Sequence, residues 1–260
     1  MKMFLNCFEC QQTLGVPNPS TAEYNDSGVF HLTCSRGHQS VTVLQQNRSE
    51  LLFEIACNAI NDGYYREAVS SFTASLERFY EYAIHVILKN GGTSQDVFKS
   101  CWKEISNQSE RQLGAFIFLW AASFGEKPGI LSNDWTSFRN KVVHKGGIPS
   151  KDEAIAFGEA VYQVMSPLRG RLSKEMANAC QAVLFETLHA LRPKGHQGPV
   201  ATASMNFFLR DSTDQAPPSL RDHLGLLEKQ AAMTRTLETM LNGNLLGKQR
   251  NITNKGDVAN

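Results

Sequence analysis

The spacing of apolar positions divides the chain into a strand-like beginning and a longer helical part. Apolar and polar residues alternate in "VFHLT" (29–33) and in "VTVL" (41–44), which predicts short strands joined by loops. From about residue 49 the period becomes helical. In residues 64–88 the apolar positions follow steps of four, three, four and four, which predicts one buried face of a long helix. These positions are Phe72, Leu76, Phe79, Ala83 and Ile87.

Further helical stretches follow as far as residue 192. The long helix is preceded by a shorter one, "LLFEIACNAI", which Asn61-Asp62-Gly63 should end, and it is followed by helices around 97–105 and 111–124. Asn133 or Asp134 could cap the next helix. A capping box at Ser150–Glu153 then opens a long helix, and another is expected past Pro167. The pattern predicts a mainly α fold, with a helical bundle over residues 48–192 and a small β-hairpin module before it.

The last part of the chain is less regular. Residues 193–218 are interpreted as a linker or an irregular strap over the bundle, because they are rich in turn-forming residues. A final amphipathic helix is expected from residue 219, and it could pack on the bundle or on a partner helix. Its apolar positions are Leu220, Leu224, Leu227 and Ala231. The end of the chain resembles a disordered tail, so residues 193–260 form the third segment.

Composition narrows the class of protein. Of 260 residues 42% are hydrophobic and 20% are charged, and the net charge is +1, as in a soluble protein with a core. This balance does not fit a protein that coats nucleic acid, so any contact with RNA should be local. The apolar run at 113–125 is too short to span a bilayer, and the first residues do not form a signal peptide. We therefore expect a cytoplasmic protein without a membrane segment.

Six cysteines fall into two groups. Cys57, Cys101 and Cys180 are scattered through helical stretches and are expected to be reduced core thiols. In the first segment, Cys7-x2-Cys10 and Cys34-x3-His38 form two close pairs that a hairpin could bring together. Zinc favours four such ligands in a tetrahedron.

The two pairs, "CFEC" and "CSRGH", resemble the knuckles of a zinc ribbon, which would occupy residues 1–47. Because all four ligands come from the protein, the zinc would be structural and would supply much of the folding free energy of so small a segment. The alternative is free thiols in a small β segment. His31 is a weaker candidate ligand, because it lies within a predicted strand.

The stretch "FRNKVVHKGG" (138–147) carries the candidate chemistry. Asn140 and His144 are four positions apart and share a helix face, and the long side chain of Arg139 can reach the same region. His144 should lie in the last turn, where the carbonyl end of the helix favours an imidazolium. The alternative is a solvated helix face with Val142 and Val143 packed inward.

An Arg-Asn-x3-His segment late in a helical bundle resembles the HEPN superfamily, and the resemblance covers about residues 49–170. It implies a metal-independent endoribonuclease that pairs two motifs across a homodimer. His144 would act as general base or acid, Arg139 would stabilise phosphoryl charge, and Asn140 would orient the histidine or the phosphate. Glu77 or Glu81 could supply an acidic group near the arginine.

The resemblance suggests RNA cleavage by a toxin or an antiviral-defence effector, which would need no cofactor for catalysis. A freely active nuclease would harm its host, so an antitoxin or a trigger partner is expected. The alternative function is a non-catalytic binding or regulatory protein, in which the zinc ribbon contacts nucleic acid or protein. Only two basic residues, Lys2 and Arg36, lie within 1–47, which argues against strong RNA binding by the ribbon itself.

Overall fold

A computed structural model describes residues 2–205, 208–209 and 219–232 of the chain. The chain divides into two compact units, residues 1–217 and residues 218–260. In the second unit residues 220–232 form a helix, which agrees with the amphipathic pattern found there. The tail expected after this helix lies outside the described residues.

The first unit begins with a small β module. β1 pairs antiparallel with β2, and β3 pairs antiparallel with β4, so the module holds two hairpins. Phe30 and Leu32 of β3 are buried while His31 and Thr33 are exposed, as the alternation predicted. The strands β1 and β2 and the short helix α1 were not predicted; β2 lies in a stretch rich in turn-forming residues, and α1 begins inside the first Cys-x2-Cys pair. The elements are β1 (Lys2–Asn6), α1 (Phe8–Leu14), β2 (Pro19–Glu23), β3 (Val29–Thr33) and β4 (Gln39–Leu44).

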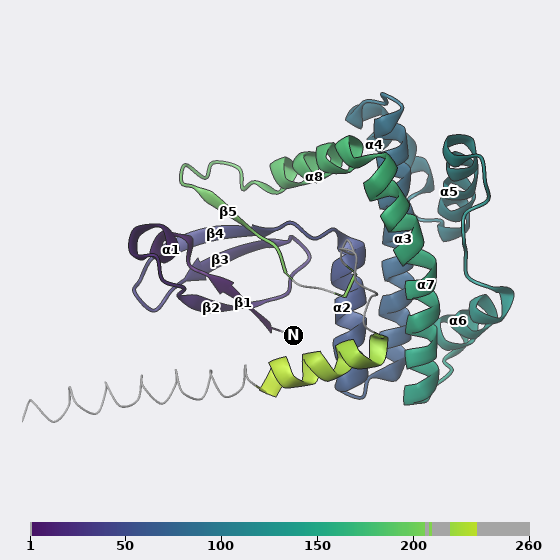
Figure 1. The fold of residues 1–260 in the computed structure, drawn as a ribbon, viewed down its shortest axis with the longest axis horizontal. Coiled ribbons are helices and arrows are strands. Elements are labelled where there is room, and N and C mark those ends of the chain that lie inside the picture. Colours follow the sequence, from purple (N-terminus) through teal and green to yellow (C-terminus); the bar gives the residue numbers. More distant parts are fainter. Residues whose placement is uncertain (1, 206–207, 210–218, 233–260) are drawn as a thin grey trace, which may run out of the picture. The chain divides into compact units, whose positions relative to one another are not determined.

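A fifth strand joins the β module from far along the chain. β5 (Val200–Ala203) lies parallel to β4, with Val41 opposite Val200, and completes a sheet of order β3-β4-β5. Figure 1 shows β5 beside β4 after the chain has returned from the helices. The segment 193–218 was expected to be an irregular strap, but part of it is therefore a sheet strand. Residues "VATA" show no strand alternation, and what makes them a strand is the open edge of β4.

The rest of the first unit is helical, which confirms the mainly α class. The central helix is α3, and α2, α5, α6, α7 and α8 all pack against it (Figure 1). All five positions of the predicted apolar face of α3 are buried. None of the helices within the described ranges is long and apolar enough to cross a membrane. The helices are α2 (Arg48–Asn61), α3 (Tyr65–Asn90), α4 (Gln95–Ile105), α5 (Ser109–Phe124), α6 (Asn133–Lys145), α7 (Lys151–Glu175) and α8 (Ala177–Leu191).

Side-chain caps begin several of these helices. The capping box predicted at Ser150 and Glu153 is present at the start of α7, and a second one joins Asn47 to Glu50 at the start of α2. The expected cap of α6 was wrong. Ser132, and neither Asn133 nor Asp134, is the N-cap, and its hydroxyl accepts a hydrogen bond from the amide of Trp135.

The break expected near Pro167 was also wrong. α7 continues through Pro167 and ends at Glu175, and α8 starts after Met176. Proline normally disrupts a helix interior because it lacks an N–H and clashes with the preceding turn. Here Pro167 is exposed, while Leu168 and Leu172 beyond it are buried. Burial of these leucines therefore outweighs the local cost of the proline.

Candidate functional site

The Arg-Asn-His motif lies in the second half of α6. Gly146 ends this helix with a φ of 70°, in the left-handed region that favours glycine, and His144 is in the last turn as expected. Arg139 and Asn140 are half-buried, whereas His144 is exposed. Val142, on the side of the helix opposite Asn140 and His144, is buried. The exposed end of the motif therefore lies on the solvent side of α6, and the other side of this helix packs against the protein.

Aromatic side chains hold α6 in place. Phe138, next to Arg139, packs against Phe157 of α7 with the ring centroids 5.6 Å apart, and Trp135 packs edge-on against both rings. Aromatic pairs of this kind contribute about 1 kcal/mol each beyond the area that they bury. These contacts fix the backbone of α6 against α7. The polar side chains of the motif therefore extend from a helix whose position is fixed.

The two ionisable groups of the motif lie close together. Arg139 Nη1 is 3.5 Å from His144 Nε2, at the outer limit of a hydrogen bond, on the exposed face of α6. Asn140 lies one turn before His144 on the same face. A guanidinium, an amide and an imidazole are thus presented to one region of solvent, where an anionic ligand could contact all three.

The structure separates the two carboxylates considered as partners of Arg139. Glu81 accepts a 2.6 Å hydrogen bond from Arg78 Nη1. Burial raises the pKa of Tyr80, the field of Arg139 opposes that rise, and the charge of Glu77 adds to it. Tyr80 on α3 is thus close to both Arg139 and Glu77. Glu81 is thus already paired with Arg78, whereas Glu77 lies one turn before Tyr80 on α3, the residue whose pKa Arg139 also affects.

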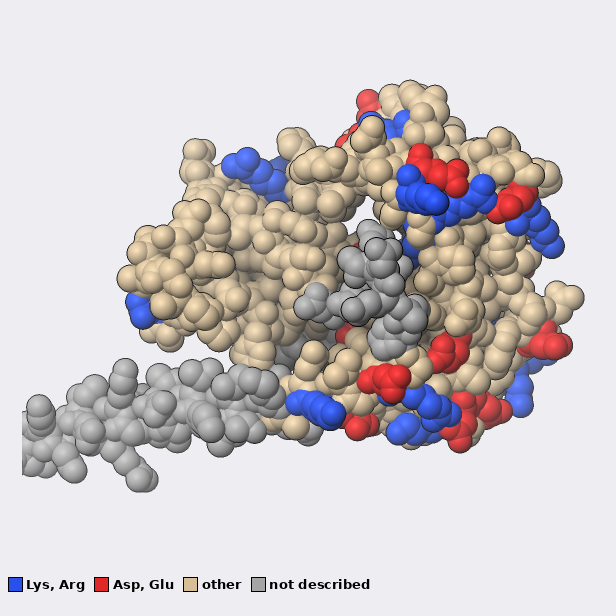
Figure 2. All heavy atoms as spheres, in the orientation of Figure 1, with Lys and Arg blue, Asp and Glu red and all other residues tan. Residues whose placement is uncertain are grey.

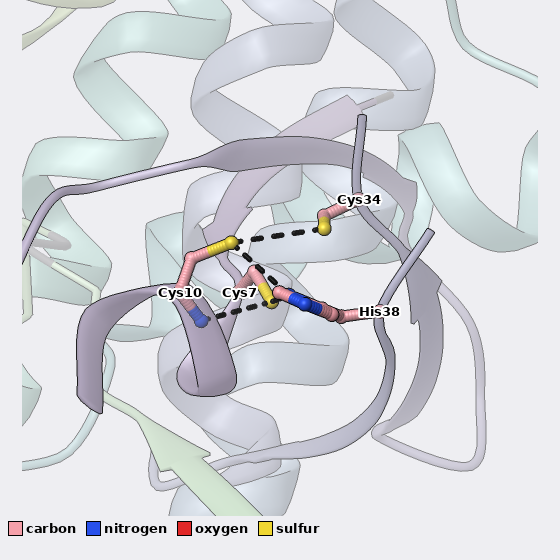
Figure 3. A group of neighbouring side chains, drawn as sticks. All are labelled: Cys7, Cys10, Cys34 and His38. Carbon is pink, nitrogen blue, oxygen red and sulfur yellow. Dashed lines mark hydrogen bonds between the residues drawn. The ribbon is translucent and has the colours of Figure 1, made fainter. Parts of the chain in front are cut away.

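The second candidate site is in the β module, where Cys7, Cys10, Cys34 and His38 come together (Figure 3). Their ligand atoms all lie within 4.8 Å of one another, and the three cysteines are buried. Cys7 is the N-cap of α1, and its sulfur accepts a hydrogen bond from the amide of Cys10. The turn after β3 brings Cys34 and His38 to the same place, because Gly37 adopts a φ of 84° there.

The spacing of these atoms fits a tetrahedral zinc ion. Zinc–sulfur bonds of about 2.3 Å place two tetrahedral sulfurs about 3.8 Å apart. The sulfurs of Cys10 and Cys34 are 3.8 Å apart, and His38 Nδ1 lies 3.2 Å from Cys10 Sγ and 3.8 Å from Cys7 Sγ. The cluster could therefore hold a zinc ion. His31, considered as a substitute ligand, is exposed on β3 and is not a member of the group.

Neighbouring groups favour metal binding at two of the four side chains, Cys34 and His38, whereas burial raises the pKa of the Cys10 thiol. Burial acts to raise the pKa of the Cys34 thiol, but hydrogen bonds from the backbone at Arg36 and His38 and from the neighbouring thiols lower it to about 7. His38 directs Nδ1 at the sulfurs, and its Nε2 lies 3.9 Å from a Glu9 carboxylate oxygen. Such an outer carboxylate fixes the ring orientation of a metal-binding histidine.

Sequence reasoning missed two contributors to this cluster. Glu9 stands between the two cysteines of the first knuckle, so its position in the sequence could have suggested a role. Asn18, whose amide donates to Cys10 Sγ at 3.4 Å, gave no signal, because only the path of the chain after α1 brings it there. No family model matches the chain, and neither does any curated protein or solved structure.

The scattered cysteines differ from expectation in one case. All three are free thiols, as predicted. Cys57 is buried in the core and Cys180 is half-buried, but Cys101 is exposed on α4. Phe98 is the buried residue of α4, so this helix presents only a narrow inner face, and Cys101 lies outside it.

Proposed function

We propose that this protein is a metal-independent endoribonuclease of the toxin or antiviral-defence type, which cuts RNA in a composite site built from the motifs of two copies. The observation that carries the proposal is the pair formed by Arg139 and His144, whose side chains meet at 3.5 Å on an exposed helix face. A cation next to an imidazole is the minimum that phosphodiester transfer needs, namely charge stabilisation and proton transfer.

The chemistry follows from these groups. His144 of one copy takes the proton of the ribose 2′-OH, and the 2′-oxygen forms a bond to phosphorus. The bond from phosphorus to the 5′-oxygen breaks, and His144 of the second copy supplies the proton that the leaving oxygen needs. Arg139 stabilises the charge on the phosphoryl oxygens, and Asn140 orients the phosphate or the imidazole. The products are a 2′,3′-cyclic phosphate and a 5′-hydroxyl, and DNA is not cut because it lacks the nucleophile.

Glu77 is the carboxylate that we assign to the support of Arg139, since both charges act on Tyr80. A carboxylate close to the guanidinium would hold Arg139 in one direction, so that the phosphate meets an ordered cation. Glu81 is a weaker choice, because it is already paired with Arg78.

Exposed apolar side chains on and after α5 and α6 support assembly of two copies. Phe118 on α5 is 78% exposed and Ile148, just after α6, is 88% exposed. Figure 1 shows α5 and α6 on the same flank of the helical part. Large apolar groups exposed to this degree favour burial against another protein surface.

The β module completes the proposal as a zinc ribbon, with the metal held by Cys7, Cys10, Cys34 and His38. Four protein ligands leave no position for a reactive water, so the zinc is structural. Over the face shown in Figure 2 the β module carries few charged side chains, in contrast to the helices. The module is therefore better suited to recognise a restraining partner, such as an antitoxin or a trigger, than to hold RNA by its phosphates.

The test is RNA cleavage in the presence of EDTA. Purified protein is incubated with total RNA and with tRNA, and the fragment ends are mapped. We expect Arg139→Ala and His144→Ala to lower the rate at least about a hundredfold, because each removes a group that acts in the transition state. Lys141→Ala is the matched control, since it removes an exposed cation from the same helix without touching the motif.

Equal cleavage by all these proteins would assign the activity to another site or to a contaminant and would contradict the proposal. Absence of cleavage by a folded, dimeric wild type, tested also in a cell extract able to supply a trigger, would favour the alternative function. In that case the protein is a binding or regulatory protein, with the helical part as its assembly module.

A further inference from the structure

The outer side of α8 is an exposed surface that contains no residue of the Arg-Asn-His motif. Five exposed side chains recur along it at steps of three, four, four and three, so they share one side of the helix. They are Asn178, Gln181, Phe185, His189 and Arg192, the last of which is the C-cap. The buried residues Ala179 and Val183 lie on the other side of α8. The five exposed residues form a continuous strip, which we call the α8 face.

Phe185 is the aromatic residue of the α8 face. Its side chain is 60% exposed, and the polar residues Gln181 and His189 lie one turn before it and one turn after it. Apart from the half-buried Leu188, the face around the ring is polar. A helix that lies on a membrane needs a broader apolar stripe. A single exposed ring between polar groups is better suited to stack on a nucleobase, because every base has a flat π surface.

The α8 face has no acidic side chain. Residues 176–210 include one acidic residue, Glu186. Its carboxylate is directed at α3, where it pairs with Lys89 and lies 3.4 Å from His85 Nε2. The negative charge of α8 is therefore engaged on the inner side of the helix and does not offset cations on the outer side.

Two exposed cations stand at the end of α8, where the chain turns toward β5. Arg192 is the first, and Lys194 is the second. The N–H of His196 donates to the carbonyl oxygen of Pro193 at 3.3 Å, and Gly195 has a φ of 79°, which defines a type II turn with Lys194 at its tip. Neither cation is in an ion pair within the described residues. Figure 2 shows basic side chains at this end of α8, beside the β module, with no acidic side chain next to them.

We propose that the α8 face and the turn after it bind single-stranded nucleic acid. One base stacks on Phe185, and Arg192 and Lys194 contact phosphates of neighbouring nucleotides. Arg192 is about 10 Å from Phe185 along the helix axis, so a few nucleotides span the distance. An exposed aromatic ring followed by cations without acidic neighbours is the usual arrangement of a site for single strands.

This inference rests on the proposed function for the identity of the natural ligand, which would be the RNA substrate. The α8 face would hold the RNA chain outside the composite site. Stacking and phosphate contacts do not require the 2′-hydroxyl, so single-stranded DNA should also bind here although the proposed reaction does not cut it. Binding of DNA can therefore be measured separately from cleavage of RNA.

The test is fluorescence anisotropy of a short labelled single-stranded DNA of mixed sequence, titrated with the full-length protein. We expect saturable binding, and weaker binding of the duplex of the same sequence, because paired bases are not free to stack on Phe185. Polyglutamate and phosphatidylserine vesicles are the competitors. Both are anionic and lack bases, so neither should displace the strand as well as unlabelled DNA does at equal charge.

Phe185→Leu tests the stacking contact. Leucine keeps an apolar side chain at this exposed position but removes the ring, and we expect the affinity to fall about five- to tenfold. Phe185→Trp is the matched control, since it keeps an aromatic surface and should bind the strand at least as tightly as the wild type. Circular dichroism of both variants checks that α8 is unchanged.

The combined change Arg192→Gln and Lys194→Gln tests the phosphate contacts. Each phosphate contact with a single strand contributes about 0.7 to the slope of log affinity against log salt concentration, so this slope should flatten by about 1.4. Lys174→Gln removes an exposed cation of α7, outside the α8 face, and should leave the slope unchanged.

The proposal is overturned if single-stranded DNA does not bind saturably, or if Phe185→Leu binds it as tightly as the wild type does. Displacement of the strand by polyglutamate or by the vesicles as efficiently as by DNA would also overturn it. His144→Ala should bind DNA normally. A protein that binds DNA through the α8 face but cuts no RNA contradicts the proposed function alone, whereas RNA cleavage that is unaffected by Phe185→Leu, together with unaffected binding, contradicts only this inference.

Discussion

Glu50 connects two parts of the helical bundle through one carboxylate. One oxygen accepts the Asn47 amide and completes the capping box of α2, and the other accepts from Arg169 of α7. Both side chains of the ion pair are largely buried. The cost of bringing two charges out of water is therefore offset only while both partners are present.

We expect Glu50→Gln to destabilise the protein by about 3 kcal/mol, because it removes the negative charge from a largely buried ion pair. Glutamine at this position still completes a capping box, so the start of α2 is preserved. The measurement is urea unfolding followed by circular dichroism.

The second substitution, Arg169→Met in the Glu50→Gln background, should recover most of the lost stability, since it removes the buried charge. A double variant as unstable as Glu50→Gln alone would show that the loss comes from packing or from the helix cap.

At the level of single residues, the sequence predicted which four side chains of the β module come together, in a group that could hold a metal ion. Cys7, Cys10, Cys34 and His38 are identified by spacing, because each knuckle is a local structure. The side-chain hydrogen bonds of Gln45 with Thr202 and of Gln46 with Ser204 could not be predicted, because only the return of the chain through β5 brings these residues beside β4.

Ser132 determines where the helix of the motif begins. Its hydroxyl accepts from the Trp135 amide, and its backbone carbonyl begins the helical hydrogen bonds. We expect Ser132→Ala to lower the free energy of unfolding by about 1 kcal/mol. Asn133→Ala, the matched control, should cost only a few tenths, because Asn133 is already inside the helix. If Asn133→Ala lowered the free energy of unfolding more than Ser132→Ala does, the N-cap would be Asn133, one of the two positions that the sequence suggested.

The helices and strands that were predicted, and those that were missed, show which sequence patterns are sufficient to predict an element. α3 was predicted because its apolar positions recur at helical spacing from Phe72 to Ile87, and all five of these positions are buried. The continuation of α7 beyond Pro167 was missed, since a local signal for termination is outweighed by Leu168 and Leu172. β1, β2 and β5 were missed because such short strands carry little alternation of their own.

For the whole molecule, we expect zinc removal to destabilise the β module and to leave the helices folded. The protein as purified should contain one zinc per chain. Chelation should speed hydrogen exchange in residues 2–44, because the cluster ties α1 to the turn after β3, while α3 and α7 stay protected. Hydrogen exchange read by mass spectrometry measures both regions at once.

Cys34→Ser should reproduce the effect of chelation and lose the metal. Cys101→Ser is the control, since Cys101 is exposed and lies outside the cluster. Equal zinc content in the two variants would contradict the assignment of the ligands. Loss of protection throughout α3 would show instead that the helices need the metal to fold.

The parallel pairing of β5 with β4 also sets an order of events during synthesis. Gln45 and Thr202, which bond across the sheet, are 157 positions apart. A ribosome adding 5–20 residues per second needs roughly 8 to 30 s to cover that distance. During this interval the nascent β module has an uncovered edge at β4. A chaperone or a neighbouring nascent chain has that time to occupy the edge, so the last strand both closes the sheet and ends the period of greatest risk of misassembly.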